Sequence, residues 1–324
     1  MYTTFFGFKE KPFSLVPNPA FLFLSQAHEN AMTYLEYGLS ENVGFVLLTG
    51  EIGSGKTTLV RHILNQMDDK TEVAVLFNTG LVSDDLVFLI LSRFDIPFDP
   101  GISRGIALEK LYAFLIDRYS MGRRTLLVID EAQNLSKQSL EDIRMLSNLQ
   151  TDNEMLLQVM IVGQPELKKT LYHPRLEQLS QRIAASYHLG PMDEAETREY
   201  IAHRLVHAGG DPEVIRPDAI EKIFQISGGI PRTINLICDA AFVYAYADGR
   251  DHIAAETIGQ VAKEDGGIGI ITKEMIQEPE SDADQLNEER LSRIEQAIER
   301  LEKKIDSCAE LLIRLDSADS SETQ

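Results

Sequence analysis

The sequence has no tryptophan, only two cysteines and no long apolar run. The cysteines, Cys238 and Cys308, lie in different segments, so they predict neither a disulfide framework nor a metal site, and a reducing cytoplasmic setting fits them. No apolar stretch approaches the ~20 residues that span a bilayer, and the N-terminus lacks the basic start and apolar core of a signal peptide. We therefore expect a cytoplasmic protein without a membrane span, which would reach the inner membrane only as a peripheral protein, through a partner.

Basic residues are also scarce, since 31 Lys and Arg stand against 51 Asp and Glu, for a net charge of −20. Non-specific binding to DNA or to anionic lipid requires a basic surface, so this balance argues against nucleic acid as a partner, although a local basic patch would be hidden in the total. The acidic excess is uneven, because residues 274–324 alone carry 15 acidic and 6 basic residues. Hydrophobic residues make up 44% of the chain, which is enough for a folded body.

Alternating strand and helix patterns over residues 41–191 predict a parallel α/β sheet. Apolar strands are expected at four places: 45–48, 73–77, 125–129 and 156–162. After Pro191 the alternation stops, and a capping-box sequence from Asp193 to Glu196 opens a run of helices. We expect a helical lid domain over 192–265, and at 1–40 a Phe/Pro-rich segment and a helix that pack on the core.

The C-terminal part of the chain has a different pattern. Residues 266–284 are glycine-rich and then acidic, which predicts a linker, and residues 317–324 are expected to be a disordered tail. Within 285–316, apolar residues alternate at spacings of three and four: Leu291, Ile294, Ile298, Leu301, Ile305, Cys308, Leu312 and Leu315. This strict heptad pattern predicts a coiled-coil helix, and the other interpretation is a single amphipathic helix that lies on the body.

A glycine-rich loop joins the first predicted strand to a predicted helix. Its sequence is Gly50-Glu51-Ile52-Gly53-Ser54-Gly55-Lys56-Thr57, followed by Thr58. The glycines let backbone N–H groups approach a phosphate, and the positive end of the helix adds to the attraction. We expect Lys56 to contact the β- and γ-phosphates of ATP and the Thr57 hydroxyl to bind Mg²⁺. A glycine-rich turn would share this composition, but the strand–loop–helix setting favours a P-loop.

Polar residues follow two of the other predicted strands. Asp130 and Glu131 come after the apolar residues 126–129, at the edge of the sheet where α/β proteins bind ligands. We expect Asp130 to hold the water shell of Mg²⁺ and Glu131 to orient and polarise the attacking water. Gln164 follows the next strand, where it could contact the γ-phosphate or that water, and the alternative is a turn residue.

Two arginines complete the expected site. Arg182 lies at the end of a predicted helix, from which it can reach the γ-phosphate of a neighbouring subunit as an arginine finger. Arg175 competes for this role, and either could be a surface residue. Arg232 follows Pro231 at the start of a lid helix, which suits a phosphate contact, and the alternative is an arginine in solvent.

The order of these motifs resembles that of the AAA+ ATPases, and their sequences look closer still to the secretion-pathway protein A (ExeA-like) family. The segments that carry the resemblance are Phe6-Gly7-Phe8, Pro12-Phe13-Ser14, Pro17-Asn18-Pro19, residues 48–58, 130–135, 163–167 and 228–232. It covers about residues 1–265, and the chain looks most like the ATPases encoded with exosortase (PEP-CTERM) and exopolysaccharide systems. The resemblance implies an AAA+ three-layer α/β/α core with a lid, ATP and Mg²⁺ as cofactors, and hydrolysis in a homo-oligomeric ring or filament. It also implies Arg182 as the finger and Arg232 as the lid sensor.

Secretion-type members of this family usually continue into a transmembrane helix and a peptidoglycan-binding domain, whereas a linker and a coiled coil are expected here. This departure favours an ATPase that drives or regulates an envelope export or exopolysaccharide assembly, through a machinery protein bound to its coiled coil. Two alternatives remain open. One is a DNA-transaction ATPase of the transposition-regulator type, and the other is a scaffold in which slow ATP turnover mainly sets assembly.

Overall fold

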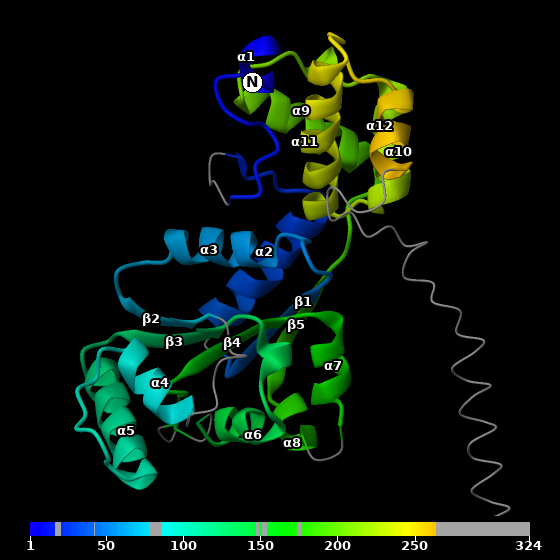
Figure 1. Cartoon of the computed structure of the whole chain (residues 1–324). Coiled ribbons are helices and arrows are strands. Elements are labelled where there is room, and N and C mark those ends of the chain that lie inside the picture. Colours follow the sequence, from blue (N-terminus) through cyan, green and yellow to red (C-terminus); the bar gives the residue numbers. More distant parts are fainter. Residues whose placement is uncertain are drawn as a thin grey trace, which may run out of the picture. The chain divides into compact units, whose positions relative to one another are not determined.

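The computed structural model describes residues 1–16, 21–41, 43–77, 86–146, 149–150, 154–173 and 176–263. The expected linker, coiled coil and tail lie outside these residues, and so do Arg175 and the Pro17-Asn18-Pro19 motif. Among the described residues, no helix is both long enough and apolar enough to cross a membrane. These residues form an α/β domain and a helical lid domain (Figure 1).

A five-stranded parallel sheet is the centre of the α/β domain, with the strand order β2-β3-β4-β1-β5. The strands are β1 (Phe45–Gly50), β2 (Thr71–Leu76), β3 (Arg124–Ile129), β4 (Gln158–Gly163) and β5 (Ile183–Leu189). Every residue of β1 and β4 is buried, because helices cover both faces of the sheet, and this burial explains their nearly continuous apolar sequences. All four strands that the sequence predicts are present.

The edge strand β5 is a correction to the expected sheet, because no strand was predicted there. It pairs in parallel with β1, with a shift in register between Phe45 and Val46. Its sequence, Ile-Ala-Ala-Ser-Tyr-His-Leu, contains small and polar residues, and several of its positions are exposed. An edge strand needs only part of its surface to be apolar, so its sequence does not stand out as a buried strand does.

Helices cover both faces of the sheet and give the expected three-layer α/β/α core (Figure 1). Helices α2 (Gln26–Ser40) and α3 (Lys56–Gln66) pack on the face that carries Val46 and Leu48. The other face carries Phe45 and Leu47, and five helices cover it: α4 (Leu86–Arg93), α5 (Arg104–Ser120), α6 (Lys137–Leu146), α7 (Pro165–Leu171) and α8 (Glu177–Ser180). Successive residues of β1 thus enter different apolar cores, as the pleat of a strand requires.

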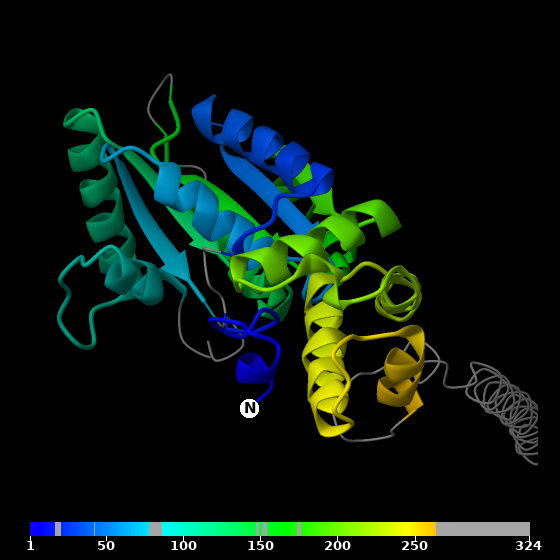
Figure 2. The same ribbon diagram turned by 90° about the horizontal axis from the view of Figure 1, so that it is seen from above.

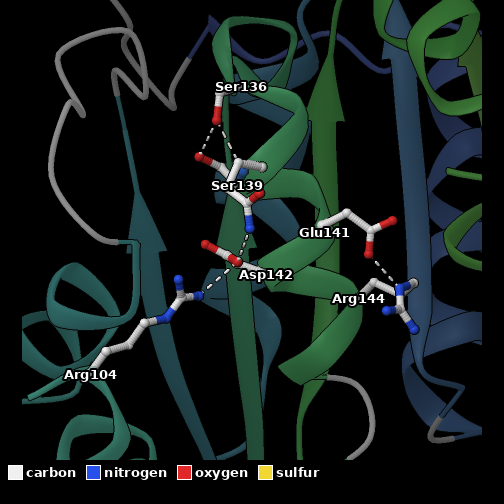
Figure 3. Close-up of polar contacts among 7 residues, drawn as sticks. Arg104, Ser136, Ser139, Glu141, Asp142 and Arg144 are labelled. Atoms are coloured by element: carbon white, nitrogen blue, oxygen red, sulfur yellow. Dashed lines mark hydrogen bonds and ion pairs between the residues drawn. The ribbon is translucent and has the colours of Figure 1, made fainter. Parts of the chain in front are cut away.

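Polar contacts hold α5 and α6 together (Figure 3). Arg104 at the start of α5 pairs with the carboxylate of Asp142 on α6, with 2.7 Å between Nη2 and Oδ1, and Gln138 Nε2 donates to the same oxygen at 3.1 Å. Asp142 is buried, so these contacts offset the cost of removing its charge from water. At the start of α6, Ser136 Oγ accepts a hydrogen bond from the backbone N–H of Ser139 at 3.0 Å, which is the contact of a helix cap.

The lid domain contains four helices: α9 (Glu194–His207), α10 (Pro217–Ser227), α11 (Pro231–Ala247) and α12 (Ala255–Lys263), with the short helix η5 (Pro212–Val214) between the first two. The predicted capping box opens α9. The Asp193 carboxylate accepts from the Glu196 N–H at 2.8 Å, and the Glu196 carboxylate accepts from the Asp193 N–H at 3.0 Å.

The Phe-rich N-terminal residues pack on the lid domain (Figure 2), whereas they and the following helix were expected to pack on the core. They begin with the short helix α1 (Tyr2–Phe5). The ring of Phe242 on α11 lies 4.9 Å from that of Phe6, 5.1 Å from that of Phe8 and 6.0 Å from that of Phe13. Leu24 and α2, later in the N-terminal segment, pack on the sheet. The lid helices leave an apolar surface around Phe242, and burying it under aromatic rings stabilises this arrangement.

Candidate nucleotide-binding site

The loop between β1 and α3 has a backbone that fits a phosphate. Gly53 and Gly55 have φ angles of +82° and +99°, a left-handed conformation that residues with a side chain adopt only with strain. Gly55 is the N-cap of α3, and no side chain caps this helix. The first N–H groups of α3 have no acceptor within the helix, so the predicted P-loop presents donors where an anion would bind.

Lys56, the first residue of α3, turns back over this loop. Its Nζ donates to the carbonyl oxygens of Gly50 at 2.7 Å and Glu51 at 2.8 Å. Burial lowers the pKa of Lys56, and the nearby charges of Glu131 and Asp130 act in the opposite direction. The ammonium group therefore lies inside the loop, where phosphate oxygens could replace the carbonyl oxygens as its acceptors.

Asp130 and Thr57 are in direct contact, although 73 residues separate them in the sequence. Thr57 Oγ1 donates to Asp130 Oδ2 at 2.8 Å, and Oδ1 of the same carboxylate accepts from the Glu131 N–H at 2.9 Å. Asp130 follows β3 directly and is buried. A hydroxyl and a carboxylate side by side are the hard oxygen ligands that Mg²⁺ prefers, so the pair fits the expected metal.

Glu131 adopts a left-handed backbone conformation, with a φ angle of +55°, where the chain turns from β3 into the short helix η3 (Ala132–Asn134). Residues held in this conformation are uncommon, and they cluster at functional sites. The Glu131 carboxylate accepts a hydrogen bond from Gln133 Nε2 at 2.6 Å and a longer one from Gln164 Nε2 at 3.5 Å. Gln164 thus lies beside Glu131, where the order of the strands predicts it.

Gln133 is a site residue that the spacing of the motifs did not single out. While its amide nitrogen contacts Glu131, its Oε1 accepts from the backbone N–H of Gln164 at 3.1 Å. Gln133 therefore joins the carboxylate after β3 to the loop after β4. The signal available in the sequence was a polar residue two positions after Glu131 at the same edge of the sheet.

Arg232 connects the lid domain to the phosphate loop. Its backbone N–H donates to the carbonyl oxygen of Gly53 at 3.2 Å. A methyl group placed on Gly53 would lie 2.4 Å from the Arg232 Cβ, so the two backbones are in close approach. Pro231 is the first residue of α11, as predicted. The lid helix therefore starts against the loop, in a position from which Arg232 could reach a bound phosphate.

Arg182 lies outside this group of residues. It stands between α8 and β5, is half-buried, and does not line the cavity described below. Its backbone N–H donates to the carbonyl oxygen of Leu179 at 3.0 Å. Its action in the site of a neighbouring subunit stays a prediction.

A cavity of about 530 Å³ opens beside the loop, and three parts of the chain line it. The α/β domain contributes the predicted site residues Ile52, Gly53, Gly55, Lys56, Thr57, Thr58, Glu131 and Gln164, together with His28. The lid contributes Met192, Tyr200, Arg204, Arg232 and Asn235. The N-terminal segment contributes apolar side chains, among them Leu15, Val16, Phe21 and Phe23, and none of these was expected at the site.

His28 on α2 contacts the loop from the side. Its Nε2 lies 3.1 Å from the carbonyl oxygen of Ser54, and its Nδ1 lies 2.8 Å from Ser25 Oγ. Because a carbonyl oxygen only accepts, Nε2 carries the proton and the Ser25 hydroxyl donates to Nδ1. Burial lowers the pKa of His28, which favours this neutral form. A single histidine 26 residues before Ser54 belongs to no motif, so the sequence did not indicate it.

Comparison with known proteins agrees with this fold. Residues 40–171 match the family model of the AAA domain. The structure of Cdc6p from Pyrobaculum aerophilum is similar, with a TM-score of 0.62, 21% identity, and coverage of 78% of this chain and 70% of that one. The ORC2 protein of Aeropyrum pernix gives a TM-score of 0.60 and 18% identity, with 81% and 73% covered. The protein therefore has the P-loop AAA+ fold that the sequence predicts.

A curated relative is similar over more of the chain. Over 268 residues the chain is 43% identical to general secretion pathway protein A of Aeromonas hydrophila, a match that covers 83% of this chain and 49% of that protein. This chain thus spans about half the length of the relative. The match confirms the resemblance to AAA+ proteins of the secretion-pathway protein A family.

Proposed function

We propose that this protein binds ATP with Mg²⁺ and hydrolyses it, and that hydrolysis drives or regulates an export or exopolysaccharide assembly of the bacterial envelope. One observation supports the proposed ATP hydrolysis most strongly. The Thr57–Asp130 contact lies beside Lys56 and Glu131 at the edge of one sheet. Phosphate donors, oxygen ligands for a metal and a carboxylate base are thereby gathered around one cavity.

Each residue has a separate task in this proposal. The N–H groups from Gly53 to Thr58 and the Lys56 ammonium bind the phosphates, and Thr57 and Asp130 hold Mg²⁺, which neutralises phosphate charge when bound. Glu131 orients and polarises the attacking water. Gln164, through its contact with Glu131, helps to position that water or contacts the γ-phosphate.

The site becomes complete only in an oligomer. Arg182 lies outside the cavity of its own chain, so we assign it to the γ-phosphate of a neighbouring subunit in a ring or filament. An arginine finger contributes roughly 10³ to 10⁵ in rate in enzymes that use one. Arg232 on the lid acts within its own chain, because α11 already touches Gly53.

The cellular process is inferred from the name of the relative and from the expected tail. General secretion pathway protein A is named for secretion, and we extend that role to this shorter chain. The coiled coil expected within 285–316 would bind a protein of the envelope machinery. This contact would bring the ATPase to the inner membrane as a peripheral protein. Recovery of partners from the bacterial envelope by the full chain, but not by a chain that lacks residues 285–324, would agree with this role.

The rate of ATP hydrolysis, measured with and without duplex DNA at moderate salt, separates the proposal from its alternatives. We expect hydrolysis that depends on protein concentration and is insensitive to DNA. Strong stimulation by DNA would instead favour a DNA-transaction ATPase. Very slow hydrolysis in the wild type, combined with ATP-dependent assembly, would favour a scaffold.

A further inference from the structure

The lid side of the cavity contains a buried polar network with no task in the proposed hydrolysis. It consists of Arg204 and Tyr200 on α9 and Asn235 on α11, which are 8%, 6% and 7% exposed. All three line the cavity. Polar groups this deeply buried are normally satisfied by hydrogen bonds, so the partners of each atom show what the network leaves open.

The hydrogen bonds of the network run from Arg204 through Tyr200 to Asn235. Arg204 Nη1 lies 3.1 Å from the Tyr200 hydroxyl oxygen, which lies 2.8 Å from Asn235 Oδ1. A guanidinium group only donates, so the Tyr200 oxygen accepts from Arg204, and the Tyr200 hydroxyl donates its own proton to Asn235 Oδ1. Burial raises the pKa of Tyr200, so the hydroxyl keeps that proton. The atom of Asn235 that faces Tyr200 is the amide oxygen, which accepts this proton.

Arg204 is itself held in place by the N-terminal segment. Its Nε donates to the carbonyl oxygen of Pro12 at 2.6 Å, and its Nη2 donates to that of Ser14 at 3.1 Å. The guanidinium carbon also lies 4.8 Å from the centre of the Phe21 ring, within the range of a cation–π contact. These contacts hold Arg204 in place, and with it the hydrogen bonds that orient Tyr200 and the Asn235 amide.

This orientation leaves the amide nitrogen of Asn235 as the free donor. Among the described residues it has no hydrogen-bond acceptor. Asn235 lies one helical turn after Arg232, whose backbone touches Gly53 of the phosphate loop. Its partner Tyr200 contacts the ring of Phe23, with 5.8 Å between centres. The amide thus lies between the phosphate loop and the aromatic side chains of the N-terminal segment, where the base of a bound nucleotide would extend.

We propose that Asn235 selects adenine by pairing with the edge that carries N1 and the 6-amino group. Its NH₂ donates to N1, and the second lone pair of Oδ1 accepts from the amino group. Hypoxanthine has an oxygen at position 6 and a proton on N1, so it requires the reversed amide. Tyr200 opposes that reversal, because its buried hydroxyl would lose Asn235 Oδ1, the acceptor of its proton among the described residues. The inference rests on the proposed ATP site, but it concerns the base and not hydrolysis.

Binding of the Mg²⁺ complexes of ATP, ITP and 2′-deoxy-ATP to the full chain tests this assignment. We expect the wild type to bind ATP about tenfold or more tightly than ITP, and to bind 2′-deoxy-ATP nearly as well as ATP. Asn235→Ala should weaken ATP binding by about tenfold and change ITP binding little. Tyr200→Phe should strengthen ITP binding while ATP binding stays nearly unchanged, because the amide can then turn over.

Tyr246→Phe, on the same helix as Asn235 but in contact with Phe5, is the matched control and should leave the ATP/ITP ratio unchanged. A purely structural role for the network would weaken both nucleotides equally in Tyr200→Phe, and that result would overturn the proposal. Equal binding of ATP and ITP by the wild type, or a loss for 2′-deoxy-ATP as large as that for ITP, would do the same. If the wild type binds no nucleotide at all, the proposed ATP site itself is wrong.

Discussion

A methyl group on Gly53 should damage the site in a way that a methyl group on another left-handed glycine does not. Gly53 has a φ angle of +82°, and its new Cβ would lie 2.4 Å from the Arg232 Cβ and 3.1 Å from the Arg232 Cδ. Gly101 has a φ angle of +87°, and its new Cβ would meet nothing within 4 Å. Gly101→Ala is therefore a matched control for the backbone conformation alone.

The two substitutions should differ in size. A left-handed conformation costs a residue with a side chain about 1–2 kcal/mol, so Gly101→Ala should lower the free energy of unfolding by that amount. Gly53→Ala carries the same cost and adds an overlap with the lid, and forced overpacking costs roughly 1–3 kcal/mol more. The shift that relieves this overlap moves the phosphate-binding N–H groups away from Arg232. ATP binding should therefore weaken by about tenfold or more, which corresponds to about 1.4 kcal/mol.

Urea unfolding and ATP titration of the wild type and both variants measure these effects. Because the closest atom is the Cβ of Arg232, Arg232→Gly should restore part of the stability of Gly53→Ala, whereas Arg232→Ala keeps that atom and should restore less. Equal losses of stability and affinity in Gly53→Ala and Gly101→Ala would refute the reasoning. Equal recovery of stability by Arg232→Gly and by Arg232→Ala in the Gly53→Ala protein would refute it as well.

Three further substitutions test other parts of the site. Lys56→Ala should abolish ATP binding in a calorimetric titration, and retained tight binding would refute the loop assignment. Arg182→Ala should keep ATP binding but hydrolyse ATP about 10³-fold or more slowly. Mixing it with Glu131→Gln protein should restore part of the hydrolysis, because hybrid interfaces combine an intact finger with an intact base. Full hydrolysis by a dilute monomer of the wild type would contradict a shared site. Burial lowers the pKa of His28 in the folded protein, so as the pH falls this histidine is protonated in the unfolded chain before it is protonated in the folded one. The free energy of unfolding should therefore decrease as the pH falls below about 6.5. His28→Gln should remove that part of the pH dependence in urea unfolding, and identical slopes would count against it.

The sheet and the phosphate loop were predictable because each has a local pattern. Buried parallel strands are apolar along their whole length, and β1, β3 and β4 show this directly in their sequences. The carboxyl ends of such strands share one edge, which is why Thr57 and Asp130 meet across 73 residues. The expected position of Gln164 beside Glu131 follows from the same geometry.

The contacts of the N-terminal segment were not predictable in this way. The aromatic residues Phe6, Phe8 and Phe13 indicate buried surface, but their sequence does not specify which surface they cover. Their partner Phe242 is more than 200 residues away in the chain. Arg204 donates a hydrogen bond to the carbonyl oxygen of Pro12, which is 192 residues away. Such long-range packing has no periodicity that a sequence displays.

The remaining site residues act through side-chain hydrogen bonds between different elements. Gln133 joins two loops, His28 joins α2 to the phosphate loop, and Asn235 depends on Tyr200 from another helix. None of these roles requires a fixed spacing along the chain, so no motif indicates them. They become visible only when the direction of each hydrogen bond is followed in the folded protein.

ATP binding and ATP hydrolysis, measured on the same samples of wild-type and Glu131→Gln protein, test the central claim most directly. If Glu131 polarises the attacking water, both proteins should bind ATP with similar affinity, and Glu131→Gln should hydrolyse it at least about 10²-fold more slowly. Equal rates of hydrolysis in the two proteins, or no hydrolysis by the wild type at a concentration where it forms oligomers, would contradict the assignment.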